Sequence, residues 1–325
     1  MTTLIILPYF GKFNSYFKLW LLSCENNSDF DWLIITDVQI EEKIPKNVKV
    51  INMSFDEFKS KVQKKFDFKI RLNKPYKLCD YKQFYGYIFE DDLRNYDYWG
   101  YCDCDLIFGN IRNFISTAIQ NDYDKLLRTG HLSLIRNDMK LNKNFKKYGT
   151  QRISLTSSVI YGYDESINGY HLGFAGELID SGYKFFDCSE WIGDVDFRYY
   201  PFYEINAKKQ PCVYEYDNGK LYRIIRKKDM LIKEEKMYVH LQKRNMQMNI
   251  KKDFSHFLIC PNEFIDFDYN TLNDEYFWNS ISDNRNNYYN FRREKIQNLK
   301  RDIYRLVHEP NKIDSLFYRF RGRKK

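Results

Sequence analysis

The chain has 325 residues, a formal net charge of +8, 43% hydrophobic residues and a mean hydropathy of −0.64. This length accommodates one large or two ordinary domains, and the hydrophobic content excludes a disordered chain. No apolar run approaches the roughly 18 residues of a membrane span, and the run at residues 4–7 is too short for a signal peptide, so we expect a cytoplasmic protein.

The first part of the chain alternates strand-like and helix-like segments. These segments occupy residues 3–7, 17–23, 32–36 and 48–53. Ser54 and Glu57 then form the capping-box pattern of a helix start. Such alternation predicts βαβ units, and therefore an α/β fold with a mostly parallel central sheet flanked by helices.

The later part of the chain is less regular. Helix-like or strand-like patterns occupy residues 76–90, 98–110, 132–135, 157–161, 164–181 and 237–241. Residues 187–203 are aromatic and irregular, and the pattern loosens beyond residue 250. We expect residues 1–250 to form the main domain and residues 251–325 to form a C-terminal extension.

Seven cysteines are scattered along the chain, at positions 24, 79, 102, 104, 188, 212 and 260. An odd count in a long chain argues against a disulfide framework and fits a reducing compartment. Cys102 and Cys104 have no second Cys/His pair at the spacing of a structural zinc site. The cysteines therefore indicate neither disulfides nor zinc.

Asp103 and Asp105 interrupt the apolar run at residues 98–110. Side chains alternate along a strand, so both carboxylates are predicted to lie on one face. Two adjacent carboxylates are costly to desolvate, and a hard cation such as Mg²⁺ relieves that cost. The end of a parallel strand is also where open α/β sheets bind ligands. This spacing predicts a metal site, although a turn cap beside a solvated carboxylate gives the same pattern.

His240 lies in a second apolar run and is followed by Lys243 and Arg244. A histidine there can be a third metal ligand, and the two cations can contact a diphosphate. By itself the pattern favours a core histidine beside a solvated basic pair. The nearby Asp-x-Asp pattern favours the metal-ligand interpretation.

Three carboxylates are candidates for a general base that takes a proton from a hydroxyl group. Asp164 and Glu165 stand at the start of a helix-like run, where they also fit ordinary capping. Asp194 is the alternative, and it is followed by Asp196 in an aromatic stretch around Trp191. Such aromatic residues stack on sugar rings in some proteins and pack in the core in others.

The signatures of several common enzyme classes are absent from the sequence. It contains no phosphate-binding loop of the NTPases, no Gly-x-Gly-x-x-Gly after the first strand, and no Gly-x-Ser-x-Gly elbow. The ordinary NTPase, dinucleotide oxidoreductase and α/β-hydrolase classes are therefore disfavoured, and a metal-dependent phosphate-ester hydrolase acting through Asp103 and Asp105 stays an alternative.

Five runs carry a family resemblance, and they lie at residues 5–11, 32–37, 77–82, 99–109 and 240–244. In these runs the chain resembles bacterial glycosyltransferases of the GT-A fold that act in capsular and cell-surface polysaccharide synthesis. The resemblance implies a nucleotide-sugar donor, in particular a UDP-sugar, a Mn²⁺ or Mg²⁺ ion, and a saccharide or lipid-linked saccharide acceptor. Inverting galactofuranosyltransferases are among such relatives, and galactofuranose is the sugar that the resemblance suggests.

The resemblance also implies roles for particular residues. Asp103 and Asp105 would hold the ion, His240 would be a third ligand, and Lys243 and Arg244 would contact the diphosphate. The remaining residues expected to bind the nucleotide are Pro8, Tyr9, Phe10, Gly11, Asp37, Lys77 and Asp80.

The C-terminal 34 residues, 292–325, hold 12 basic and 4 acidic residues and so carry the whole net charge of +8. Ile296, Leu299 and Ile303 fall at helical spacing within this stretch, which predicts a basic amphipathic helix. Such a helix can bind an anionic membrane surface from the cytoplasmic side, or it can pack on the core. The balanced charge of the rest of the chain argues against nucleic acid as a partner.

Overall fold

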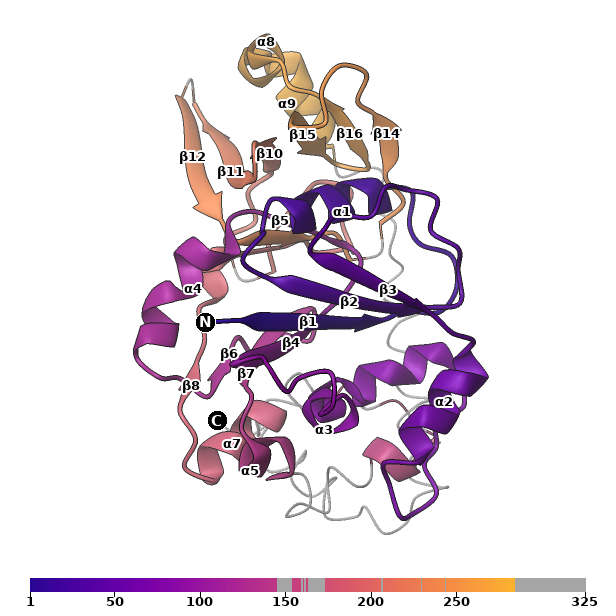
Figure 1. Ribbon diagram of the computed structural model, residues 1–325. Coiled ribbons are helices and arrows are strands. Elements are labelled where there is room, and N and C mark those ends of the chain that lie inside the picture. Colours follow the sequence, from indigo (N-terminus) through magenta and orange to yellow (C-terminus); the bar gives the residue numbers. More distant parts are fainter. Residues whose placement is uncertain are drawn as a thin grey trace, which may run out of the picture.

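The computed structural model describes residues 1–144, 154–158, 160, 162, 173–205, 207–228, 230–242 and 244–283. In this part of the chain the strands form three sheets, of seven, six and three strands, with helices packed around the largest (Figure 1). The expected α/β fold with a mostly parallel central sheet flanked by helices is confirmed, and it is the architecture that a GT-A resemblance implies. The basic tail at residues 292–325 lies outside the described residues.

The central sheet has the strand order β3-β2-β1-β4-β7-β6-β8. Its strands are β1 (Thr3–Pro8), β2 (Asp31–Thr36), β3 (Val48–Asn52), β4 (Tyr98–Cys102), β6 (Lys125–Leu126), β7 (Leu132–Arg136) and β8 (Phe185–Phe186). The pairs β3–β2, β2–β1 and β1–β4 are parallel, whereas β7 runs antiparallel to both β4 and β6. Strands β1 and β4 are buried along their whole length, which is why they read as continuous apolar runs in the sequence.

Helices cover both faces of this sheet, with α1 on one face and α2 and α3 on the other (Figure 1). The helical segments before β8 are α1 (Phe17–Glu25), α2 (Phe55–Gln63), η1 (Pro75–Asp80), η2 (Lys82–Phe84), α3 (Tyr85–Ile88), α4 (Ile111–Gln120), α5 (Met139–Asn142) and α7 (Phe174–Asp180). Side chains of β1 alternate between the two layers: Leu4 and Ile6 pack with α2 and α3, and Ile5 and Leu7 pack with α1 and α4. The capping box of Ser54 at the start of α2 is confirmed.

Two expected elements differ in the structure. The helix predicted over residues 76–90 is divided into the short helices η1, η2 and α3. The strand predicted over residues 157–161 is not seen at its described positions 157, 158 and 160. Of the helix predicted over residues 164–181, α7 is confirmed, and residues 164–172 lie outside the described part.

A six-stranded sheet follows with the order β12-β11-β10-β15-β16-β14. Its strands and the two helices after them are β10 (Val213–Asp217), β11 (Lys220–Lys227), β12 (Met230–Lys236), β14 (Gln247–Asn249), β15 (His256–Cys260), β16 (Glu263–Asp266), α8 (Tyr269–Asn273) and α9 (Glu275–Ile281). The strand predicted over residues 237–241 is confirmed as β13 (Tyr238–His240) of the third sheet, but the sequence analysis missed β10 to β12 before it and β14 to β16 after it. Strand β12 is largely exposed and rich in lysine and glutamate, so it lacks the apolar pattern of a core strand. Residue 250 lies between β14 and β15 of this sheet.

A small third sheet joins distant parts of the chain in the order β5-β13-β9. It contains β5 (Leu106–Phe108), β13 (Tyr238–His240) and β9 (Ile192–Asp194), the last preceded by η4 (Ser189–Trp191). In this sheet His240 pairs with Leu106 on one side and with Asp194 on the other. The sheet therefore brings residues from three segments to the end of β4.

Two further expectations concern the chain as a whole. All seven cysteines are free, and none forms a disulfide. Among the helices of the described residues, none combines the length and the apolar character needed to cross a membrane.

Candidate active site

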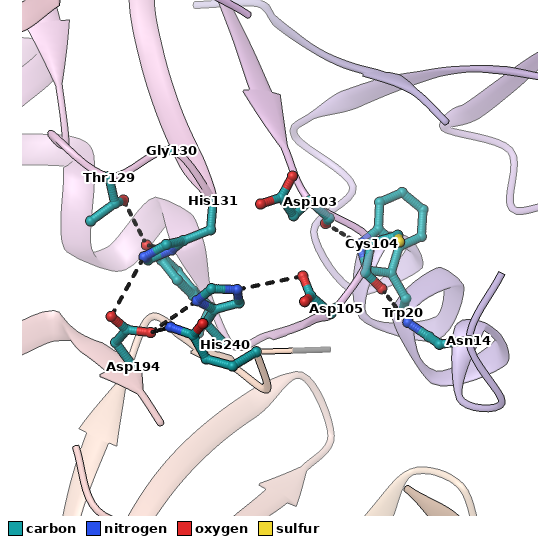
Figure 2. A network of polar contacts seen from close by, with 12 residues as sticks. Asn14, Trp20, Asp103, Cys104, Asp105, Thr129, Gly130, His131, Asp194 and His240 are labelled. Atoms are coloured by element: carbon teal, nitrogen blue, oxygen red, sulfur yellow. Dashed lines mark hydrogen bonds and ion pairs between the residues drawn. The ribbon is translucent and has the colours of Figure 1, made fainter. Parts of the chain in front are cut away.

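The candidate site lies where β4 ends, and four segments of the chain contribute side chains to it (Figure 2). The loop after β4 supplies Asp103 and Asp105, the turn before β7 supplies His131, and the paired strands β9 and β13 supply Asp194 and His240. Strand β7 is antiparallel to β4, so its first residues lie beside the last residues of β4. The backbone N–H of Asp103 accordingly donates to the carbonyl of His131 at 3.0 Å.

The Asp-x-Asp pair lies in the loop between β4 and β5 and not within a strand, which corrects the sequence interpretation. The Trp20 indole donates to the carbonyl of Asp103 at 3.2 Å, and the Asn14 amide donates to the carbonyl of Cys104 at 2.8 Å (Figure 2). The side chain of Asp103 is 38% exposed and that of Asp105 is 7% exposed. Trp20 and Asn14 thus fix the backbone of the loop, while its two carboxylates point into the site.

His240 lies between two carboxylates (Figure 2). Its Nε2 is 3.5 Å from Oδ1 of Asp105, and its Nδ1 is 2.9 Å from Oδ1 of Asp194. One ligand atom from each of Asp103, Asp105 and His240 lies within 4.8 Å of the others. The structure therefore brings together the three residues predicted as metal ligands.

Asp194 lies on the opposite side of the His240 ring from Asp105. Its Oδ1 also accepts a hydrogen bond from the Gln242 amide at 2.8 Å, and its Oδ2 is 3.9 Å from Nε2 of His131. This engagement favours a role in orienting His240 over the predicted role as a general base. The neighbouring Asp196 forms an ion pair with Arg198 and does not join the site.

His131 is a site residue that the sequence analysis missed. Its ring stacks on that of His240 with centroids 4.2 Å apart, and its Nδ1 is 2.9 Å from the Tyr238 hydroxyl. His131 lies in the site because β7 pairs antiparallel with β4, which places the residue before β7 beside Asp103. Since the sequence does not reveal that pairing, His131 had no visible connection to the aspartates.

The carboxylates determine which histidine is charged. Burial opposes a charge on His240, but Asp105 and Asp194 outweigh burial and raise its pKa to about 10. Burial also opposes the charge on Asp194, yet its hydrogen bond with His240 and the positive charge of that ring lower its pKa. Burial and the charge of His240 lower the pKa of His131 well below its usual value. In the metal-free chain His240 is therefore the cation and His131 the neutral ring.

Lys82 is a second residue that the sequence analysis did not assign to the site. Its buried ammonium lies 2.7 Å from Oδ1 of Asp103 and donates to the carbonyl of Gly130 at 2.8 Å. Lys82 begins η2, which is far from Asp103 in sequence, so no spacing pattern connects the two. The chain thus places its own cation beside the Asp-x-Asp loop.

The loop after β1, predicted to bind the nucleotide, lies at the same edge of the sheet. The N–H of Gly11 donates to Oδ1 of Asp37 at 2.8 Å, and the φ of +103° at Gly11 favours glycine. Tyr9 stacks on Phe13 at 4.7 Å, and burial together with the adjacent Cys104 thiol and the Asp105 carboxylate raises the pKa of its hydroxyl. The structure therefore brings Tyr9, Gly11 and Asp37 to this edge. In contrast, Pro8 and Phe10 are buried, the latter in the core.

Lys77 and Asp80, also predicted to contact the nucleotide, are turned into the protein. Their side chains have no exposed surface and form an ion pair at 2.5 Å. The second oxygen of Asp80 accepts a hydrogen bond from the N–H of Gly162 at 2.6 Å. Because both side chains are enclosed, they stabilise this region and do not present a surface to a ligand.

Arg244 was predicted to contact the diphosphate, but its guanidinium binds the protein itself. It donates to the carbonyls of Asp196, Tyr199 and Tyr200, at 3.0 Å to Asp196 and 2.9 Å to Tyr200, and to Asn262 at 3.3 Å. Arg244 thus fixes the segment after β9. The other predicted diphosphate contact, Lys243, lies outside the described residues.

Asp164 and Glu165, the other two candidates for the general base, also lie outside the described residues. Within the described part of the chain, Asp194 is the only one of the three base candidates that can be placed.

Comparison with known proteins assigns a family but no function. Residues 5–268 match a model described as "Family of unknown function (DUF6625)", so the chain belongs to that family. No curated protein matches the chain. Among solved structures, a galactosyltransferase LgtC in complex with donor and acceptor sugar analogues has 8% identity and a TM-score of 0.33, with 60% of this chain and 76% of LgtC covered. The glycosyltransferase GlyE of Streptococcus pneumoniae TIGR4 has 11% identity and a TM-score of 0.27, with 58% of this chain and 45% of GlyE covered. Likeness of this size is too low to assign a function.

Proposed function

We propose that this member of the DUF6625 family is a metal-dependent glycosyltransferase that moves a sugar from a nucleotide-sugar to a saccharide or lipid-linked saccharide. The observation that carries the proposal is the convergence of Asp103, Asp105 and His240 at the end of β4. Tyr9 and Gly11 follow β1 at the same edge of the sheet, where open α/β sheets bind ligands.

The residues present fit a divalent cation. Two carboxylate oxygens and one imidazole nitrogen are ligands that suit Mn²⁺. Mg²⁺ prefers oxygen ligands, and the two carboxylates supply them. These ligand atoms all lie within 4.8 Å of one another. That span is close to the distance of about 4.2 Å between opposite ligands of a small six-coordinate ion. Asp194 holds the other nitrogen of His240, as carboxylates do for many metal-bound histidines. A bound ion would supply positive charge to the departing diphosphate.

Residues of the chain itself provide the rest of the proposed mechanism. The Lys82 ammonium lies beside Asp103 and can stabilise charge on the leaving diphosphate as it develops. Asp194 fixes the orientation of His240. An inverting reaction also needs a carboxylate that deprotonates the acceptor hydroxyl, and Asp164 and Glu165 stay the candidates because Asp194 is engaged with His240.

The finer assignments follow from the sequence resemblance. We propose a UDP-linked donor, galactofuranose as the transferred sugar, and a role in capsular or cell-surface polysaccharide synthesis. The net charge of residues 292–325 supports binding to the anionic inner face of the cell membrane. A lipid-linked acceptor would be presented at that surface.

Thermal shift with UDP, GDP and CDP, each with and without Mn²⁺, tests the proposal, since a ligand that binds the native state raises the melting temperature. We expect stabilisation by UDP that requires Mn²⁺ and is lost in Asp105→Asn. The matched control is Asp56→Asn, which removes an exposed carboxylate on α2 and should respond like the unmodified chain. No stabilisation by any of the three nucleotides, or an unchanged response in Asp105→Asn, would contradict the proposal.

A further inference from the structure

A pocket of about 480 Å³ opens beside the candidate active site. Its walls come from η4 and β9 on one side and from β11 and β12 on the other. The lining residues that matter here are Trp191, Asp194, Glu204, Arg223, Glu234 and Lys236. Asp194 belongs both to this pocket and to the site, because its carboxylate holds His240 at 2.9 Å.

A network of buried charges shapes this pocket. Glu204 is buried; it accepts a hydrogen bond from the Tyr214 hydroxyl at 2.8 Å and lies 3.3 Å from the Arg223 guanidinium. Lys236 donates to the carbonyl of Glu190 at 2.7 Å. Burying several charged groups is costly unless they are paired and hydrogen-bonded. These groups are held in place, and they present polar atoms to the pocket in a fixed arrangement.

The wall formed by β9 is equally fixed. A Cβ added at Gly193 would lie 2.6 Å from the ring of Tyr214. The strand therefore packs directly on Tyr214, the residue whose hydroxyl holds Glu204. The position of Asp194 at the end of β9 is linked through this contact to the polar floor of the pocket.

The charge of the lining distinguishes between classes of ligand. Among the residues that the structure describes, five carboxylates line the pocket and two cations do, Arg223 and Lys236. Both cations already have carboxylate neighbours in Glu204 and Glu234. The net negative lining disfavours an anion such as a nucleotide or a uronic acid. It favours hydroxyl groups, which donate to carboxylates and accept from a guanidinium.

Trp191 adds an apolar surface to this polar lining. It is partly exposed, and it packs on Phe114 and Phe186 with ring centroids 5.6 Å and 5.2 Å away. A few placed polar groups beside an aromatic ring are typical of ligand pockets, and a volume near 480 Å³ lies within their usual range of about 300–1,000 Å³. Hydroxyl groups and a stacking face together describe a saccharide.

We propose that this pocket is the subsite for an uncharged saccharide, which serves as the acceptor. The assignment of the acceptor role rests on the proposed glycosyltransferase function, whereas binding of a neutral saccharide can be tested separately. Because Asp194 joins the pocket to His240, a sugar bound here lies beside the candidate metal centre, as an acceptor must.

Tryptophan fluorescence provides the test. The four other tryptophans, Trp20, Trp32, Trp99 and Trp278, are buried, so Trp191 should be the reporter. Methyl β-galactopyranoside, methyl β-glucopyranoside and lactose are the neutral probes, with glucuronate and N-acetylneuraminate as anionic counterparts. We expect at least one neutral sugar to change the emission in a saturable way and the anionic sugars to have no effect.

Variants locate and quantify the binding. Trp191→Phe should lose the emission change, whereas the control Trp278→Phe should keep it. Glu204→Gln keeps the reporter and should weaken neutral-sugar binding about tenfold, the loss expected for one charge-assisted hydrogen bond. Glu234→Gln, at the exposed rim, should shift affinity in the same direction by less, and it serves as the test if Glu204→Gln does not fold.

The outcomes separate this inference from the proposed function. No emission change with any neutral sugar, or equal changes with anionic sugars, would overturn the pocket assignment. The Mn²⁺-dependent UDP response of Trp191→Phe should be unchanged, because Trp191 does not belong to the metal centre. Saccharide binding without any nucleotide response would retain the subsite and refute the transferase, and the reverse result would retain the transferase and refute the subsite.

Discussion

Binding of Mn²⁺ to this chain should release about one proton per ion at pH 7.5. The cause is His240, whose pKa is raised to about 10 because Asp105 and Asp194 outweigh the opposing effect of burial. In the metal-free chain both ring nitrogens are then protonated at neutral pH. A metal ligand needs a lone pair on Nε2, the nitrogen 3.5 Å from Asp105. The proton on Nε2 must therefore leave when the ion binds.

The size of the effect follows from the pKa. A group with a pKa of about 10 is about 99% protonated at pH 7.5, whereas a histidine with the ordinary pKa of about 6.5 is roughly 10% protonated. The expected release is thus about one proton per ion, against about 0.1 for an unperturbed histidine. The dissociation constant for Mn²⁺ should accordingly fall about tenfold per pH unit between about pH 6.5 and 8.5.

Isothermal titration calorimetry in buffers of different ionisation enthalpy measures this proton release directly. His240→Gln should bind Mn²⁺ more weakly and release almost no proton, whereas the surface control Asp56→Asn should match the unmodified chain. A release near 0.1 proton at pH 7.5, or an affinity that no longer changes above about pH 7, would refute the reasoning.

Three further perturbations test separate parts of the structure. Asp194→Asn should weaken Mn²⁺ binding by about 10–100-fold without unfolding the chain, because the amide cannot hold the protonated Nδ1 of His240 as a carboxylate does. Calorimetry measures the affinity for Mn²⁺, and circular dichroism shows whether the chain stays folded. An unchanged affinity would contradict the orienting role of Asp194. Gly193→Ala should lower the free energy of unfolding by about 1–3 kcal/mol in urea, since its Cβ would meet Tyr214 at 2.6 Å. Ser54→Ala should lower the free energy of unfolding by about 1 kcal/mol, because it removes the N-cap of α2. An unchanged urea midpoint for Gly193→Ala would contradict the packing on Tyr214, and an unchanged midpoint for Ser54→Ala would contradict the role of the cap.

The sequence predicts the central sheet well because its first strands are buried on both faces. Strands β1, β2 and β4 read as unbroken apolar runs of strand length, and the structure places all three in the sheet. The start of α2 was also visible, because a capping box acts within four residues. Features that depend on local sequence alone were therefore predicted correctly.

The six-stranded sheet could not be read in the same way. Strand β14 has only three residues, and β12 exposes most of its side chains. Short or exposed strands lack a clear apolar alternation, and they are defined by their partners. The order of this sheet also depends on pairing between segments that are distant in sequence, as when β10 pairs with β15.

The residues of the candidate site also fall into those that local sequence predicts and those that depend on distant segments. Asp103, Asp105 and His240 could be predicted as a set because carboxylates and a histidine inside apolar runs are chemically unusual. The positions of Lys82 and His131 depend on which segments meet in space, and no sequence spacing reveals that. The prediction for Arg244 failed for a related reason: its partners are backbone carbonyls, which a sequence does not display.

The most direct test of the proposed function is the release of UDP from a panel of UDP-sugars in the presence of Mn²⁺, with and without lactose or the methyl glycosides as acceptors. The account predicts that an acceptor stimulates UDP release from at least one UDP-sugar and that Asp105→Asn abolishes the stimulation. Equal release with and without an acceptor would indicate a hydrolase, and no release from any UDP-sugar would contradict a UDP-dependent transferase.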